Sequence, residues 1–213
     1  MKPKRTKYLG LINDRAHITI MAGKKGSGKT QLLVRLLRDK HGYRGVYDEV
    51  VIVSPTFNLQ KVWNTIAKEG VTVYNEFSTE ILEKIYNEKQ SKTHIQTLII
   101  LDDNGDDLKR ISTAIFQKMV SNSRHLNISM VVLLQKITQA PTHLRSNSDS
   151  YVVFSACSTR EIDQLYAEIG ILDKQRFQFL FRDAVQNQYS CFVGSMLDGK
   201  LRFYRNFEFE YKN

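Results

Sequence analysis

The sequence predicts an α/β domain in which a mainly parallel β-sheet carries helices on both faces. Short apolar, β-branched segments alternate along the chain with longer segments whose apolar residues recur at helical spacing, as in repeated strand–helix units. The chain has 213 residues, of which 42% are hydrophobic and 25% charged, a composition typical of a globular protein. We expect a single domain over residues 1–213, with a basic N-terminal segment at 1–15 and a C-terminal hairpin extension at 188–213.

The first expected elements flank a glycine-rich loop. The β-branched and apolar run His17–Ala22 predicts a strand, and the leucines of Thr30–Lys40 share one stripe of a predicted helix. Glu49–Val53 is a second apolar strand, which Pro55 ends because proline has no N–H to donate to a sheet. We expect Asn58–Lys68 to form the next helix.

The middle of the chain continues this alternation. Val71–Tyr74 predicts a short strand, and Ser78 can cap a helix that runs to about Lys89. Thr97–Asp102 is a largely apolar run that ends in an acidic residue, and it predicts a buried strand. Ile111–Ser123 has the apolar spacing of an amphipathic helix.

The last part of the chain changes from strand–helix units to a hairpin. Asp198-Gly199 lies between two segments of alternating residues, which is a strong local signal for a β-hairpin. In order, the expected elements are a strand at Ile128–Gln135, a loop around Pro141, a strand at Tyr151–Phe154, a helix capped by Thr159 that ends at Ile169, and hairpin strands at Tyr189–Val193 and Lys200–Tyr204.

The loop between the first strand and the first helix matches the phosphate-binding pattern Gly-x-x-x-x-Gly-Lys-Ser/Thr, also called Walker A. Backbone N–H groups in such a loop converge on phosphate oxygens, and the following helix directs its positive end at them. Lys29 is expected to bridge the β and γ phosphates of ATP, and the Thr30 hydroxyl to bind Mg²⁺. A glycine-rich turn without a ligand is the alternative. The expected nucleotide-binding residues are Gly23, Lys24, Lys25, Gly26, Ser27, Gly28, Lys29 and Thr30.

Two adjacent carboxylates end the strand Thr97–Asp102, as in a Walker B segment. Asp102 is expected to bind Mg²⁺, and Asp103 to accept a proton from the attacking water or to orient it. In the alternative interpretation the acidic cluster caps the next helix, which we favour for Asp106 and Asp107.

Gln135 lies at the end of the expected strand Ile128–Gln135, just as Asp102 and Asp103 lie at the end of theirs. Its amide can hydrogen-bond both the γ phosphate and the attacking water, so we interpret it as a sensor of hydrolysis, with a solvated strand end as the alternative. Arg124 precedes that strand and Arg145 follows it. Either is a candidate arginine finger, although a lone surface arginine is usually only solvated.

The net charge is +9, which favours an anionic partner such as nucleic acid. The candidate DNA-contacting residues are Lys109, Arg110, Lys136 and Arg145, but scattered basic residues more often form a solvated face. Cys157 and Cys191 are too few for a disulfide framework and too far apart for a metal-ligand pair, and no apolar run reaches the length of a membrane span. We expect a soluble, intracellular protein.

In the order and spacing of these segments, the chain resembles the FtsK/HerA superfamily of DNA-pumping ATPases, and within it the genome-packaging ATPases of poxviruses, virophages and related large DNA viruses. The segments that carry the resemblance are Gly23–Thr30, Leu98–Asp103, Ser123–Gln135, Leu144–Asn147 and Tyr151–Asp163.

This resemblance implies a RecA-like P-loop fold and an ATP-driven translocase of double-stranded DNA that works as a hexameric or pentameric ring. It also implies a location in the virion or the host cytoplasm, with capsid or portal proteins as candidate partners. Active sites then lie between subunits. Lys29 and Thr30 bind phosphate and magnesium, Asp102 binds magnesium, and Gln135 is the sensor. The resemblance makes Arg124 the first choice for a finger that acts in trans. The bacterial motors carry Glu where this chain has Asp103, which makes the catalytic role of that residue less secure than the magnesium-binding role of Asp102.

Two other function classes remain open at this point. Another P-loop enzyme, helicase-like or a small-molecule kinase, would share the phosphate-binding loop; Val53–Thr56 resembles a helicase motif, but such helicases need two domains, and there is no Asn-Lys-x-Asp segment of a GTPase. A non-enzymatic DNA-binding scaffold with a degenerate nucleotide site would explain the basic charge. The intact Lys29, Thr30 and Asp102 argue against such degeneracy.

Overall fold

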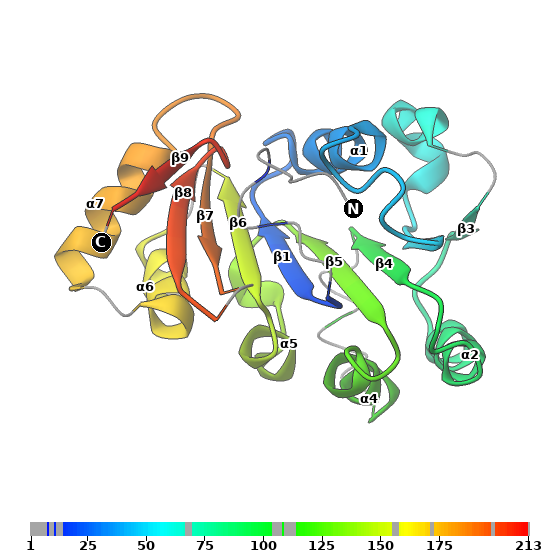
Figure 1. The fold of residues 1–213 in the computed structure, drawn as a ribbon. Helices are drawn as coiled ribbons and strands as arrows, with labels where there is room; N and C mark the ends of the chain where they lie inside the picture. The colour runs from blue at the N-terminus through cyan, green and yellow to red at the C-terminus, as the bar shows by residue number, and fades with distance from the viewer. Residues whose placement is uncertain are drawn as a thin grey trace.

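The sheet of this protein is long and mixed, and the helices lie on both sides of it (Figure 1). The computed structural model describes residues 8, 11, 15–66, 70–103, 108, 114–154, 158–170, 173–196 and 199–212. Within these ranges, the sheet has nine strands in the order β3-β2-β4-β5-β1-β6-β7-β8-β9.

The bounds of the strands β1 to β8 agree to within about two residues with those expected from apolar patterning, whereas β9 was not expected. The strands are β1 (Ile18–Ala22), β2 (Glu49–Val53), β3 (Val71–Tyr74), β4 (Thr97–Asp102), β5 (Ile128–Leu134), β6 (Ser150–Phe154), β7 (Cys191–Ser195), β8 (Arg202–Arg205) and β9 (Phe209–Tyr211). The α-helices are α1 (Lys29–Arg38), α2 (Thr79–Gln90), α4 (Ala114–Asn122), α5 (Thr142–Ser146), α6 (Thr159–Ile169) and α7 (Lys174–Ala184), and the short 3-10 helices are η1 (Phe57–Leu59), η2 (Lys61–Thr65) and η3 (Ile137–Gln139).

The sheet has a parallel part and an antiparallel part. The parallel part has the strand order β3-β2-β4-β5-β1-β6. The strands β7, β8 and β9 extend the sheet beyond β6, and each is antiparallel to the strand before it. The predicted hairpin is therefore present as β7 and β8, with Phe192 opposite Arg205. Its expected turn residue Asp198 lies outside the described residues.

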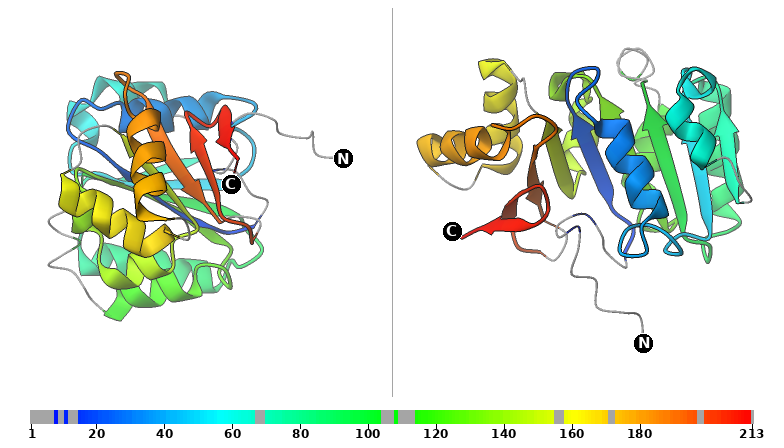
Figure 2. Two further views of the ribbon diagram at one scale, coloured as in Figure 1. Left: turned by 90° about the vertical axis from the view of Figure 1, so that its left-hand side faces the viewer. Right: turned by 90° about the horizontal axis from the view of Figure 1, so that it is seen from above.

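Two apolar cores, one on each face of the sheet, hold the helices in place. Alternate residues of β1 divide between them: Ile18, Ile20 and Ala22 join the core under α2, α4, α5, α6 and α7, whereas Met21 joins the core under α1 and η2. Figure 2 shows these two helical layers from the side and from above. Because side chains alternate between the faces of a strand, a strand covered on both faces must be apolar throughout, as β1, β4 and β5 are over most of their length.

The order of the strands determines which loops meet. β5 lies between β1, which precedes the phosphate-binding loop, and β4, which ends in Asp102. All three strands are parallel, so their carboxyl ends meet at one edge of the sheet. The segments that follow them are therefore neighbours in space although they are far apart in the sequence.

Three expectations about local structure were wrong. Asn58–Lys68 is not one helix but the two short helices η1 and η2, separated by an extended Gln60 with φ −101° and ψ 101°. The cap of α6 is Ser158 rather than Thr159, since the Ser158 hydroxyl accepts from Glu161 N and the Glu161 carboxylate accepts from Ser158 N. The loop around Pro141 contains η3 and α5.

The helix α7 was not expected, although Asp173 caps it by accepting from the N–H groups of Gln175 and Arg176. The first residues of the expected helix Ile111–Ser123 lie outside the described part of the chain. Among the described residues, no helix combines the length and the apolar character needed to cross a bilayer.

Candidate functional site

The loop between β1 and α1 has a backbone that only glycine adopts without strain at two positions. Gly26 has φ 79° and Gly28 has φ 101°, and α1 begins directly after Gly28. At Gly23, an added Cβ would lie 2.8 Å from the Cβ of Phe154 on β6. The Gly23 N–H donates to the Leu134 carbonyl of β5 at 3.1 Å, so the loop is anchored to both neighbours of β1. Its backbone shape follows from the glycines of the motif.

Lys29, the first residue of α1, turns its ammonium back over this loop. Its Nζ donates to the carbonyls of Gly23 at 2.5 Å and Lys24 at 3.1 Å. Burial lowers the pKa of Lys29, and the nearby charges of Asp102 and Asp103 act in the opposite direction. A half-buried ammonium held by two carbonyls can exchange them for phosphate oxygens, which carry far more negative charge.

Asp102 ends β4 and is only 4% exposed. Its Oδ2 accepts from Trp63 Nε1 at 3.3 Å, from Ser54 Oγ at 3.4 Å and from Gln60 Nε2 at 3.5 Å. Burial raises the pKa of Asp102 to about 6; the Trp63 hydrogen bond opposes this shift, and the neighbouring Asp103 adds to it. A carboxylate that burial makes costly to ionise gains strongly from a cation placed beside it.

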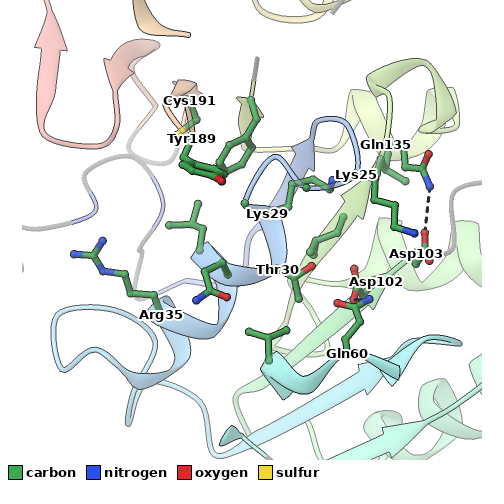
Figure 3. A pocket seen from close by; sticks show the side chains of 18 of the residues that line it. Lys25, Lys29, Thr30, Arg35, Gln60, Asp102, Asp103, Gln135, Tyr189 and Cys191 are labelled. Carbon is green, nitrogen blue, oxygen red and sulfur yellow. Dashed lines mark hydrogen bonds between the residues drawn. The ribbon is translucent and has the colours of Figure 1, made fainter. Parts of the chain in front are cut away.

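Asp103 is exposed and has a left-handed backbone, with φ 60°. Aspartate is among the few non-glycine residues that adopt this conformation at modest cost. The turn directs the side chain toward Gln135, whose Nε2 donates to Asp103 Oδ1 at 3.4 Å (Figure 3). The amide of Gln135 lies after β5 and the carboxylate after β4, so the ends of these two neighbouring strands bring an amide and a carboxylate together.

One cavity of about 1300 Å³ collects these side chains. Lys29, Thr30, Asp102, Asp103 and Gln135 line it together, and in Figure 3 Asp102 lies between Thr30 and Gln60. Thr30 supplies a hydroxyl oxygen from the start of α1, and Asp102 a carboxylate oxygen from the end of β4. Oxygen donors of these two kinds suit Mg²⁺.

The cavity continues past the loop to a second end that the sequence did not reveal. There Arg35 of α1 faces Tyr189 and Cys191, and Asn206 and Phe207 of the C-terminal segment complete the wall. Tyr189 lies close to the phosphate-binding loop, since a Cβ on Gly28 would be 3.5 Å from its ring. These residues match no motif. The only signal in the sequence for this end of the cavity was an aromatic residue, Tyr189, close to the start of the C-terminal extension.

Arg124 lies at the opposite edge of the sheet, in the turn before β5. Its Nη2 donates to Asp149 Oδ1 at 2.7 Å, and Asp149 Oδ2 accepts from Ile18 N at 2.9 Å. The Arg124 side chain is 70% exposed. Because β5 spans the sheet between Arg124 and Gln135, this guanidinium faces away from the cavity of its own chain.

Arg145 is held within the fold, in contrast to Arg124. Its Nε donates to Glu168 Oε1 at 2.7 Å, Nη2 donates to Thr142 Oγ1 at 3.3 Å, and the side chain is 14% exposed. This placement does not favour Arg145 as a finger or as a DNA contact. Lys136 is exposed beside Gln135, and Lys109 and Arg110 lie outside the described residues.

These features define the class of P-loop NTPases: a phosphate-binding loop before α1, an acidic residue at the end of β4, and between β1 and β4 the strand β5, which is followed by Gln135. Within this class, the chain belongs to the Poxvirus A32 protein family, which matches residues 4–195. It is similar to the uncharacterized protein 015R of Frog virus 3, with 23% identity over 82% of this chain and 55% of that protein. It is also similar to the DNA packaging protein OPG160 of variola virus, with 28% identity over 64% of this chain and 52% of that protein.

The chain thus spans about half the length of these curated relatives. Among solved structures, the genome packaging NTPase B204 of Sulfolobus turreted icosahedral virus 2, in complex with AMP, has a TM-score of 0.68 and 16% identity over 90% of this chain and 98% of that chain. The DNA-packaging ATPase B204 of Sulfolobus turreted icosahedral virus also has a TM-score of 0.68, with 13% identity. At these identities the likeness shows a shared fold.

Proposed function

We propose that this protein is a magnesium-dependent ATPase that drives double-stranded DNA into a viral capsid, working as a ring with its active sites at the subunit interfaces. The observation that carries the proposal is the single cavity in which Lys29, Thr30, Asp102, Asp103 and Gln135 meet. A phosphate ligand, a pair of magnesium ligands and a pair of water-orienting groups are the parts that ATP hydrolysis needs.

The shape of the cavity supports one orientation of the nucleotide. The triphosphate lies along Gly23–Thr30 and its γ phosphate points toward Asp103 and Gln135, because these two side chains lie at one end of the cavity. The base and ribose then lie at the other end, near Tyr189 and Arg35. An aromatic ring and a guanidinium both stack well on a purine.

In this orientation each side chain has one task. The ammonium of Lys29 leaves the carbonyls of Gly23 and Lys24 and neutralises charge on the β and γ phosphates. Thr30 and Asp102 would hold Mg²⁺, and the bound ion would supply further charge neutralisation. Gln135 orients the attacking water by hydrogen bonding, and Asp103 accepts its proton.

The DNA-packaging part of the proposal rests on family and charge. Relatives in the family are named DNA packaging proteins, and B204 shares the fold and is described as a genome packaging NTPase. The net charge of +9 favours a polyanionic substrate. Arg124, exposed at the edge opposite the cavity, suits a finger that reaches the site of the next copy in a head-to-tail ring.

The test is an ATPase assay with and without duplex DNA, on protein whose assembly state is measured in the same buffer. Duplex DNA is expected to stimulate hydrolysis at low salt, and the stimulation should fall as salt rises, because contacts with phosphates release counterions. Lys29→Ala is expected to abolish turnover. DNA-independent hydrolysis would instead support another P-loop enzyme, and nucleotide binding without hydrolysis in the assembled protein would support a scaffold.

A further inference from the structure

Three side chains of the segment between β2 and β3 converge on one oxygen of Asp102. Ser54, Gln60 and Trp63, which we call the Asp102 donor cluster, all donate to Oδ2, at distances of 3.4, 3.5 and 3.3 Å. They come from three different pieces of local structure: the end of β2, the extended residue between η1 and η2, and η2 itself.

The sheet register and the two short helices explain how these donors meet. Val53 pairs with Leu101, so the next residue of each strand, Ser54 and Asp102, lie side by side. The chain then turns through η1 and η2 and returns Trp63, which is fully buried and stacks on Phe57 with ring centroids 5.7 Å apart. Gln60 is fixed between them, since its Nε2 also donates to Thr56 Oγ1 at 2.6 Å.

We propose that the Asp102 donor cluster positions the Asp102 carboxylate for the Mg²⁺ that accompanies the bound nucleotide, with Ser54, Gln60 and Trp63 as positioning residues. This inference rests on the proposed function of the cavity. Partners that hydrogen-bond a metal ligand fix its orientation, and their loss typically lowers metal affinity by about 10- to 100-fold. The three distances are near the long limit for hydrogen bonds, so the orientation depends on the three donors jointly.

Ordinary satisfaction of buried polar groups explains only part of this arrangement. A buried indole N–H needs an acceptor, and Asp102 supplies one for Trp63. Gln60 is different, because it is only partly buried and lines the cavity, where its amide has access to water. Burial does not require the Gln60 amide to turn toward Thr56 and Asp102. The convergence of an accessible donor on the same oxygen indicates orientation of the carboxylate.

The test uses Gln60→Ala and Trp63→Phe, which each remove one donor. Thr65→Ala is the control for Gln60→Ala, because Thr65 belongs to η2 but its hydroxyl donates to the Val62 carbonyl. Phe57→Leu is the control for Trp63→Phe, because it disturbs the ring stack without removing a donor to Asp102. The measurement is binding of a non-hydrolysable ATP analogue as a function of Mg²⁺ concentration, with EDTA as the zero point and thermal unfolding alongside.

Both donor variants are expected to need about 10-fold more Mg²⁺ for half-maximal binding, at the low end of the range for such partners, with unchanged affinity in EDTA. Thr65→Ala should match the wild type, and Phe57→Leu, which keeps all three donors, should shift the Mg²⁺ dependence less than Trp63→Phe does. Wild-type magnesium dependence in Gln60→Ala would overturn the inference, whether or not Trp63→Phe folds. If the wild-type protein itself binds no nucleotide, or binds it without regard to Mg²⁺, the proposed function fails instead.

A second readout needs no substitution in the cluster. Trp63 is the single tryptophan of the chain, so its fluorescence reports on the surroundings of this one indole, which include the Asp102 carboxylate and the stacked Phe57 ring. Adding Mg²⁺ and the analogue to the wild-type protein is expected to change this emission, and the change should be lost in Asp102→Asn. An equal change in Asp102→Asn would contradict the inference.

Discussion

At the scale of single residues, Asp103 combines a left-handed backbone with an exposed carboxylate that meets Gln135. The tight turn sends the residue after β4 toward the end of β5 rather than along the strand direction. The sequence indicated a functional carboxylate here. It could not indicate the turn, because aspartate marks many other kinds of loop.

Replacing Asp103 by Asn tests the role of the carboxylate charge without changing the left-handed backbone. Asparagine also tolerates the left-handed conformation, so Asp103→Asn is expected to fold and to bind nucleotide as the wild type does. It should lose at least about 100-fold in turnover, because the amide cannot accept the proton of the attacking water. Parallel assays of binding and hydrolysis check this. Turnover close to that of the wild type would assign the proton acceptor elsewhere.

Asp102 makes the stability of the nucleotide-free protein depend on pH. Its pKa is about 6 in the folded protein against 3.8 as the ordinary value, so between these values the folded state binds more protons than the unfolded state. Stability therefore falls as pH rises through this interval. Asp102→Asn removes the titration and is expected to stabilise the protein at pH 7 by about 2–3 kcal/mol.

The gain from Asp102→Asn should shrink as the pH falls through this interval and vanish below about pH 3, where the wild-type carboxyl group is protonated in both states. Urea unfolding at several pH values, without Mg²⁺ or nucleotide, gives this difference directly. If the stability difference between the wild type and Asp102→Asn does not change with pH, ionising Asp102 costs no more free energy in the folded protein than in the unfolded chain.

At the scale of elements, apolar runs predicted the parallel strands well, because most positions of a strand that is buried on both faces are apolar. The segment Asn58–Lys68 was predicted less well. Its apolar spacing suits a helix, but Asn58, Asn64 and Thr65 have low helix propensity. The contacts of Gln60 and Trp63 with Asp102 are long-range interactions that a local pattern cannot contain.

Two helices show what local signals can and cannot give. The helix α7 has buried apolar residues at Phe177, Leu180, Phe181 and Ala184, and this helical spacing is by itself sufficient to predict a helix. For α6 the helix was predicted but the cap was displaced by one residue, because Ser158 and Thr159 are both good capping residues. The Glu161 three residues after Ser158 was the deciding signal.

The capping box of α6 gives a test with a built-in control. Ser158→Ala removes the acceptor for Glu161 N and is expected to lower stability by about 1 kcal/mol. For a chain of this size the unfolding temperature should fall by roughly 2–4 °C. Thr159→Ala is the control, since Thr159 is exposed in the first turn and should change stability little. Equal losses in the two variants would contradict the observed cap.

At the scale of the whole molecule, the position of Arg124 decides which kind of cooperation between copies is possible. It lies at the edge of the sheet opposite to Lys29, so a single chain does not bring the two together. The sequence suggested a finger from its place in a motif. If Arg124 is a finger, the fold requires it to act on the site of a neighbouring copy, and the sequence of one chain does not determine where that copy lies.

Mixing two inactive variants tests this cooperation. Lys29→Ala lacks the phosphate ligand but keeps Arg124, and Arg124→Ala has the reverse defect. If Arg124 acts in trans, about a quarter of the interfaces in an equal, random head-to-tail mixture recover both groups. Mixed subunits should then regain part of the wild-type ATPase rate. Two variants that stay inactive in verified mixed assemblies would leave Arg124 as a partner of Asp149 only.

The strand order also governs when the protein can acquire its nucleotide site during synthesis. β1 pairs only with β5 and β6, whose partners for Ile18 and Thr19 are Met130 and Ser150. Until the ribosome has released β5, β1 has no partner strand and the Gly23 N–H has no Leu134 carbonyl to donate to. The contact of Gly23 with Phe154 forms later still, because it needs β6. Contacts of such long sequence separation form slowly. The nucleotide site therefore forms late in folding, and nascent chains that stop before β6 should fail to bind ATP.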